Sequence, residues 1–89
     1  MKTQKLTFHC DRGHGWLEVT QADIEALGIA GLISAYSYTQ GGKAYLEEDC
    51  DANLYIEGAK AAGWTIQIVE KYTDADSHIR RMESFKVLA

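Results

Sequence analysis

The chain has 89 residues, of which 46% are hydrophobic and 25% charged, so it is large enough for one small folded domain and too short for two. Its net charge of −4 argues against a dominant nucleic-acid surface, because affinity for phosphates comes mostly from lysine and arginine. It contains no apolar stretch near the roughly 20 residues of a membrane helix and no visible signal peptide. We expect a cytoplasmic protein that does not bind membranes, with an ordered core at residues 4–72 and a partly ordered tail at 73–89.

The N-terminal residues predict a β-hairpin. Residues 4–10 alternate in polarity, with Leu6 and Phe8 on one face and charged or polar side chains on the other, which is typical of a half-buried strand. Residues 11–15 contain two glycines and predict a turn, and residues 16–19 predict the returning strand.

A short helix is expected next, over residues 21–27. Thr20 has the side chain of an N-cap, and Asp23 stands where it would complete a capping box by reaching back to the Thr20 backbone. Gly28 is suited to the left-handed position that ends a helix.

A second hairpin is predicted around Gly41-Gly42, a pair of residues that favours a two-residue turn. It joins strands at 33–39 and 43–46. With these glycines as the loop, Tyr38 lies opposite Tyr45.

The remaining elements are a helix, a strand and a tail. The helix is expected to begin near residues 49–51, capped by carboxylates, and to end at Gly63; a strand follows at 64–72. The tail at 78–88 fits either a short edge strand or a helical turn. The order ββ-α-ββ-α-β predicts a two-layer α+β domain, with two helices packed on one face of a mainly antiparallel sheet.

One surface stands out as a candidate contact site. Tyr36, Tyr38 and Tyr45 are expected to share a face, and tyrosine is common at protein interfaces. The alternative is that these tyrosines face the core, with Ala44 and Leu46 turned outward. The predicted partner-binding residues are the three tyrosines and the acidic run that follows: Tyr36, Tyr38, Tyr45, Glu47, Glu48, Asp49 and Asp51.

No catalytic or metal motif follows from the spacing of the reactive residues. His9, Cys10, His14 and Cys50 match no standard zinc pattern, and the acidic run lacks the glycine and alternating ligands of a calcium-binding loop. A position near the start of a helix suggests a lowered pKa for the Cys50 thiol, although no histidine that could act as a base lies near it in the sequence. We therefore predict no cofactor, no metal and no catalytic residue.

Three blocks carry a resemblance: His14-Gly15-Trp16-Leu17, Tyr36-Ser37-Tyr38 and the run from Tyr45 to Asp51. They resemble a family of small uncharacterised proteins encoded by phages, prophages and plasmids. That family has no settled activity, so the resemblance implies a genetic context rather than a chemistry. It leads us to expect a non-enzymatic accessory protein in a bacterial host cell, which binds a host protein or complex and inhibits a defence system such as CRISPR or restriction.

Two other functions stay open from the sequence. One is a small metal- or cysteine-dependent enzyme that uses the acidic run and Cys50, and the other is an acidic mimic of nucleic acid. Direct nucleic-acid binding is not expected. The tyrosines suit a homodimer as well as a host partner.

Overall fold

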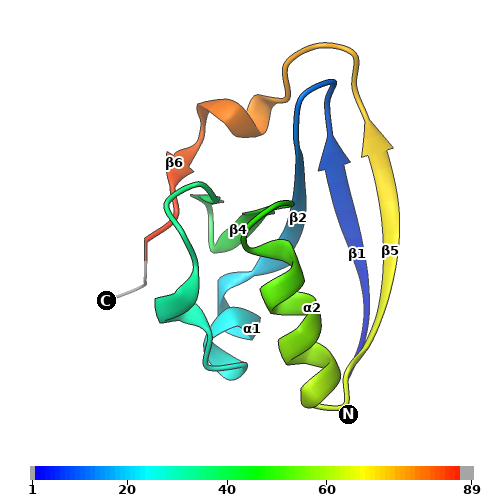
Figure 1. The fold of residues 1–89 in the computed structure, drawn as a ribbon, viewed down its shortest axis with the longest axis vertical. Coiled ribbons are helices and arrows are strands. Elements are labelled where there is room, and N and C mark those ends of the chain that lie inside the picture. Colours follow the sequence, from blue (N-terminus) through cyan, green and yellow to red (C-terminus); the bar gives the residue numbers. More distant parts are fainter. Residues whose placement is uncertain (1, 87–89) are drawn as a thin grey trace.

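A computed structural model describes residues 2–86 as one six-stranded sheet with two α-helices (Figure 1). The strands lie side by side in the order β5-β1-β2-β4-β3-β6, and every neighbouring pair is antiparallel except β1 and β5. The strands are β1 (Thr3–Cys10), β2 (Gly15–Thr20), β3 (Tyr38–Gln40), β4 (Lys43–Glu47), β5 (Thr65–Tyr72) and β6 (Glu83–Ser84), and the helices are α1 (Gln21–Ala26) and α2 (Ala52–Ala61). The predicted α+β class with a mainly antiparallel sheet is confirmed, and the sixth strand is the short edge strand β6 in the tail.

Both helices contribute to the core on one face of the sheet. Leu17 and Leu46, paired across β2 and β4, are fully buried there and pack in one cluster with Ile24 of α1 and Tyr55 of α2. Burial raises the pKa of Tyr55 to about 12, and its hydroxyl donates to the Gln4 side chain at 2.8 Å. The prediction from alternation that Leu6 and Phe8 face the core is therefore confirmed, since both pack against this cluster.

The opposite face carries a second cluster that the sequence did not predict. Trp16, Tyr45 and Ile79 are buried together, and Ile79 belongs to a 3-10 helix at His78–Arg81 in the C-terminal segment. Ile79 thus packs on the side of the sheet away from the helices, and β6 then pairs with the edge of β3. Figure 1 shows the segment passing from the end of β5 over the end of the sheet to β6. Part of the sheet therefore lies between two covering layers.

Local capping and turn signals agree with the structure. The Thr20 side chain accepts the backbone N–H of Asp23 at 3.1 Å, and Gly28 adopts a φ of 71° where α1 ends. The Gly41-Gly42 loop, with φ values of 58° and 80°, sets the predicted register of Tyr38 opposite Tyr45. Asp23 does not complete a capping box; its carboxylate accepts Lys2 and Gln4 side chains instead.

The strand predicted at 33–39 is wrong over most of its length. A 3-10 helix occupies Ala30–Leu32, and only Tyr38–Gln40 pair as β3. The physical reason is Asp51, whose carboxylate accepts the backbone N–H and hydroxyl of Ser34 and the hydroxyl of Ser37. These bonds hold the segment in a turn, where the Ser37 N–H donates to the Ser34 carbonyl.

The tail combines both expected conformations, a 3-10 helix at His78–Arg81 followed by the short strand β6. Phe85 is buried in the helix-side core, whereas Val87 lies outside the described residues. No helix in the described part of the chain is long and apolar enough to cross a membrane.

Candidate functional site

A pocket of about 300 Å³ opens where the β1–β2 turn, the end of β4 and the C-terminal segment meet. It combines aromatic, acidic and basic groups in a small volume. Its lining residues are His14, Trp16, Tyr36, Tyr38, Glu47, Asp49, Cys50 and Arg80. We call it the His14 pocket.

Aromatic rings and a guanidinium form one side of the His14 pocket. The Trp16 ring is 2% exposed, lies edge-on to Tyr38 with 6.3 Å between ring centroids, and carries the Arg80 guanidinium 5.2 Å from its centre. The Trp16 indole Nε1 is buried and has no hydrogen-bond partner among residues 2–86.

The charge of Arg80 is balanced inside the protein. Its Nε donates to Oδ2 of Asp11 at 2.7 Å and its Nη2 to Oδ1 at 2.8 Å, a bidentate pair. The Arg80 guanidinium, together with the Ser77 backbone N–H, holds the pKa of Asp11 well below its ordinary value. The guanidinium therefore contributes little free positive charge to the pocket.

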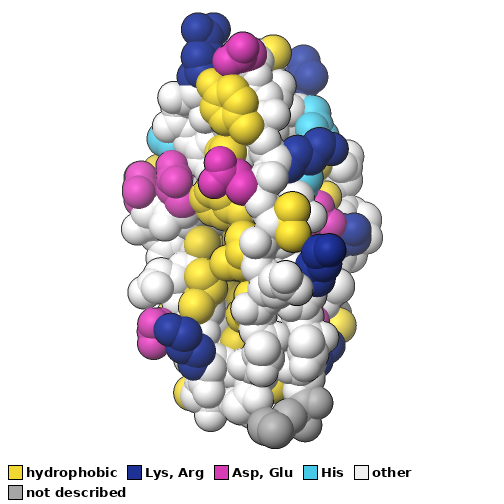
Figure 2. All heavy atoms as spheres, turned by 90° about the vertical axis from the view of Figure 1, so that its right-hand side faces the viewer, with side chains coloured by type: hydrophobic (Ala, Val, Ile, Leu, Met, Phe, Trp, Pro, Cys, Tyr) yellow, Lys and Arg dark blue, Asp and Glu magenta, His cyan; other side chains and the backbone are white. Residues whose placement is uncertain are grey.

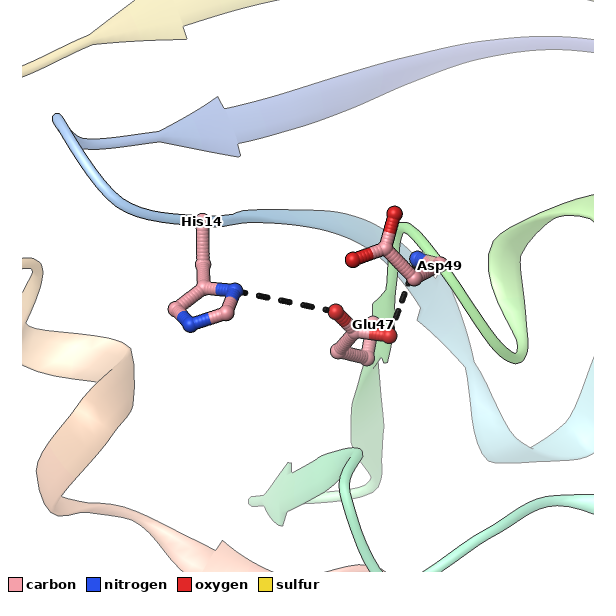
Figure 3. A group of neighbouring side chains, drawn as sticks. All are labelled: His14, Glu47 and Asp49. Carbon is pink, nitrogen blue, oxygen red and sulfur yellow. Dashed lines mark hydrogen bonds and ion pairs between the residues drawn. The ribbon is translucent and has the colours of Figure 1, made fainter.

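Acidic and imidazole groups form the other side. His14, Glu47 and Asp49 each offer a ligand atom, and these atoms all lie within 4.8 Å of one another (Figure 3). Glu47 is fixed by its own turn, because its Oε2 accepts the backbone N–H groups of Asp49 and Cys50, both at 2.9 Å. Its Oε1 faces Nδ1 of His14 at 3.7 Å.

Cys50 is not the activated thiol that its expected position at a helix start suggested. Desolvation and the neighbouring carboxylate of Glu47 raise the pKa of the Cys50 thiol. The helix begins later, at Ala52, so the thiol does not benefit from its positive end. At neutral pH Cys50 is therefore mainly the unreactive thiol form.

The four residues considered for zinc do not come together. His14 and Cys50 line the His14 pocket, whereas His9 and Cys10 line a different hollow beside β5. His9 is engaged elsewhere, with its Nε2 2.7 Å from Oε1 of Glu18. His9, Cys10, His14 and Cys50 are therefore not placed to bind one zinc ion together.

The structure buries part of the predicted contact face. Tyr38 and Tyr45 do share the face away from the helices, but Tyr45 is buried beneath the C-terminal segment, and Tyr36, 72% exposed, lies outside the strand. Glu47 and Asp51 are also buried, at 8% and 2% exposure. Of the acidic run, only Glu48 and Asp49 face solvent.

The carboxylates of the run have internal roles that capping rules did not predict. Asp51 is the residue before α2, yet its side chain makes no cap bond; it binds Ser34 and Ser37. Glu47, at the end of β4, holds the turn at Asp49 and Cys50. The acidic run is therefore mostly an organised turn rather than a charged surface.

Three of the five exposed large hydrophobic side chains in the described chain lie along β5, a strand that we had not predicted to be a contact site. Ile68, Val69 and Tyr72 are 46%, 43% and 55% exposed. Figure 2 shows hydrophobic side chains running down the middle of this side of the molecule. The available signal was the run Ile66 to Val69, which places apolar side chains on both faces of one strand.

The β5 backbone is also free on one side, since within residues 2–86 only β1 pairs with it. The N–H groups of Thr65 and Thr73 donate to carbonyls of the β1 side. The backbone N–H and C=O groups of successive residues point to alternate sides of a strand. Those of the even-numbered residues between Thr65 and Thr73 therefore point away from β1. These are Ile66, Ile68, Glu70 and Tyr72.

Comparisons with protein-family models, with curated proteins and with solved structures gave no match to this chain. Function therefore has to be inferred from the side chains and the backbone themselves.

Proposed function

We propose that this chain is a non-enzymatic accessory protein that binds another protein by adding a strand of that partner to the free edge of β5. The observation that carries the proposal is the β5 edge itself. It is eight residues long, its outer backbone groups are unpaired in the described chain, and Ile68, Val69 and Tyr72 lie exposed beside them.

Such an edge is unusual for a protein that works alone. Soluble proteins protect long edge strands with proline, bulges, charged side chains or covering segments, because an open edge is a template for pairing with another chain. Of these, β5 has only the charged residues Glu70 and Lys71, near its C-terminal end. β5 contains no proline and pairs with β1 in unbroken register from Thr65 to Tyr72. An extended partner would gain main-chain hydrogen bonds from the edge and specificity from the exposed side chains.

The resemblance to small phage, prophage and plasmid proteins suggests which partner to test. We propose a bacterial host protein, with a defence complex such as CRISPR or restriction as the first candidate. A small protein that occupies a sheet edge can act by blocking an interface, which needs neither cofactor nor catalytic group.

The alternatives from the sequence are less well supported. The cysteine-dependent form of the enzyme alternative needs a thiolate, and the pKa of the Cys50 thiol is raised. Its metal-dependent form stays open, because His14, Glu47 and Asp49 lie close together. A nucleic-acid mimic needs a row of exposed carboxylates, and Glu47 and Asp51 are buried. The strand edge has no comparable difficulty.

Two substitutions at Glu70 test the edge. Its N–H faces away from β1, so Glu70→Pro should remove an outward donor without breaking the sheet, and Glu70→Ala should remove only the side chain. We expect the alanine variant to capture the same host protein as the wild type from a lysate, and the proline variant to capture none. Affinity for the captured protein, once it is purified, then gives the size of the loss.

Circular dichroism and thermal melting must show that both variants are folded. Equal capture by the proline variant and the wild type would show that binding does not use the β5 edge. Sedimentation of the purified protein tests whether a second copy of the chain, instead of a host protein, pairs with the β5 edge. In that case the wild type would be a dimer and Glu70→Pro a monomer.

A further inference from the structure

We propose that His14, Glu47 and Asp49, which line the His14 pocket, bind one divalent first-row metal ion such as Zn²⁺ in preference to Mg²⁺ and Ca²⁺. This site goes beyond the proposed protein binding and uses no residue of β5. His14 comes from the β1–β2 turn, Glu47 from the end of β4 and Asp49 from the following turn (Figure 3).

The spacing of the ligand atoms fits shared coordination better than direct bonding. Nδ1 of His14 and Oε1 of Glu47 are 3.7 Å apart, which is too long for a hydrogen bond. Two ligands that each lie about 2.1 Å from one tetrahedral ion are separated by roughly 3.4 Å. With all three ligand atoms within 4.8 Å of one another, a small rotation of the exposed His14 and Asp49 side chains closes the site.

Glu47 is held as a metal ligand needs to be held. The backbone N–H groups of Asp49 and Cys50 both donate to its Oε2, so the carboxylate is fixed and Oε1 is left to face His14. Hydrogen bonds of this kind to a ligating carboxylate orient it toward the metal.

Electrostatics also favours a cation. Glu47 is 8% exposed, and no lysine or arginine within residues 2–86 forms an ion pair with it. The nearby Arg80 is already paired with Asp11. A buried carboxylate is costly without a compensating charge, which a divalent ion beside Oε1 would supply.

The ligand types select the metal. An imidazole with two carboxylates suits Zn²⁺ and its neighbours in the first transition row, whereas Mg²⁺ and Ca²⁺ prefer oxygen ligands alone. Three protein ligands leave at least one coordination position unfilled. The ion would therefore be able to bind a further group that enters the pocket.

Calorimetric titration of the chelator-treated protein with ZnCl₂ and with MgCl₂ tests the site. We expect one Zn²⁺ per chain and no comparable Mg²⁺ binding. Even loss of a group that only supports a ligand weakens metal binding about 10- to 100-fold. His14→Ala and Asp49→Asn should therefore each weaken Zn²⁺ binding at least about tenfold. Both side chains are exposed, so the fold should persist.

Two matched variants serve as controls. His78→Ala removes an exposed histidine from the C-terminal segment, and Glu48→Gln neutralises the exposed carboxylate next to the site; neither residue belongs to the ligand group. Both should bind Zn²⁺ like the wild type. Absence of stoichiometric Zn²⁺ binding by the wild type would refute the proposal, as would equal affinity in His14→Ala and Asp49→Asn, or preference for Mg²⁺.

Discussion

Replacing Asp51 by alanine is expected to lower the free energy of unfolding by about 2–4 kcal/mol, because several buried neutral donors lose their charged acceptor. Small domains have in total roughly 5–15 kcal/mol of stability, so this loss is a large fraction of the whole. The effect is large because Asp51 is only 2% exposed and has several internal donors.

Asp51 connects three parts of the fold. It precedes α2, its carboxylate accepts the N–H and hydroxyl of Ser34, and it accepts the hydroxyl of Ser37. The Ser37 hydroxyl in turn accepts the backbone N–H of Glu47 at 2.9 Å, at the end of β4. Alanine would leave these buried donors without an acceptor, and each unsatisfied donor carries a desolvation cost.

Denaturant unfolding followed by circular dichroism measures the change. Glu48→Ala is the control, since it removes an exposed carboxylate three positions away, and a surface substitution of this kind should change stability by less than about 0.5 kcal/mol. Equal stability of Asp51→Ala and Glu48→Ala would contradict the assigned role of the network.

The predictions that succeeded depend on neighbours in sequence. The Gly41-Gly42 turn and the Thr20 cap need only residues a few positions apart, and both occur as expected. The alternation in residues 4–10 fixed the helix-facing side, because its period is a property of the strand alone.

The predictions that failed depend on contacts between distant segments. Asp51 was interpreted as a helix cap, but its partner Ser34 lies 17 positions earlier and pulls residues 33–37 out of the expected strand. The burial of Tyr45 depends on Ile79 in the C-terminal segment, whose position no local pattern determines. Hairpin register alone therefore could not predict that the C-terminal segment covers Tyr45.

The candidate sites show the same limit. The sequence placed Glu47 and Asp49 together but separated them from His14, which reaches them only because β2 and β4 are adjacent in the sheet. The β5 edge required knowing that β5 ends the sheet and pairs in parallel with β1. Composition and spacing do not contain that information.

Asp11→Asn is expected to release the C-terminal segment from the sheet and to remove part of the acid sensitivity of the fold. Oδ1 of Asp11 accepts the backbone N–H groups of Gly13 and His14 in the β1–β2 turn, and Oδ2 accepts the Ser77 N–H. With the bidentate Arg80 pair, one carboxylate joins positions 69 apart in the chain. An asparagine side chain keeps one acceptor oxygen and replaces the other with a donor.

The pH dependence follows from the lowered pKa of Asp11 in the folded protein, which is caused chiefly by Arg80 and the Ser77 N–H. The ordinary pKa of an unfolded aspartate is about 3.9. Above that pH both states are ionised and the stabilisation is complete. As the pH falls below about 4, the unfolded chain takes up the proton first, so the wild type progressively loses this contribution.

Thermal melts of wild type and Asp11→Asn between pH 2 and pH 7 test this expectation. The wild type should melt at the higher temperature at neutral pH, and the gap should narrow as the pH falls below about 4. Hydrogen exchange at neutral pH should be faster in residues 77–85 of the variant, because Ser77 and Arg80 lose their anchor. Glu57→Gln, which neutralises an exposed carboxylate of α2, should keep a melting temperature near that of the wild type throughout. A gap between wild type and Asp11→Asn that stays constant down to pH 2 would show that the ionised Asp11 does not hold the C-terminal segment against the sheet.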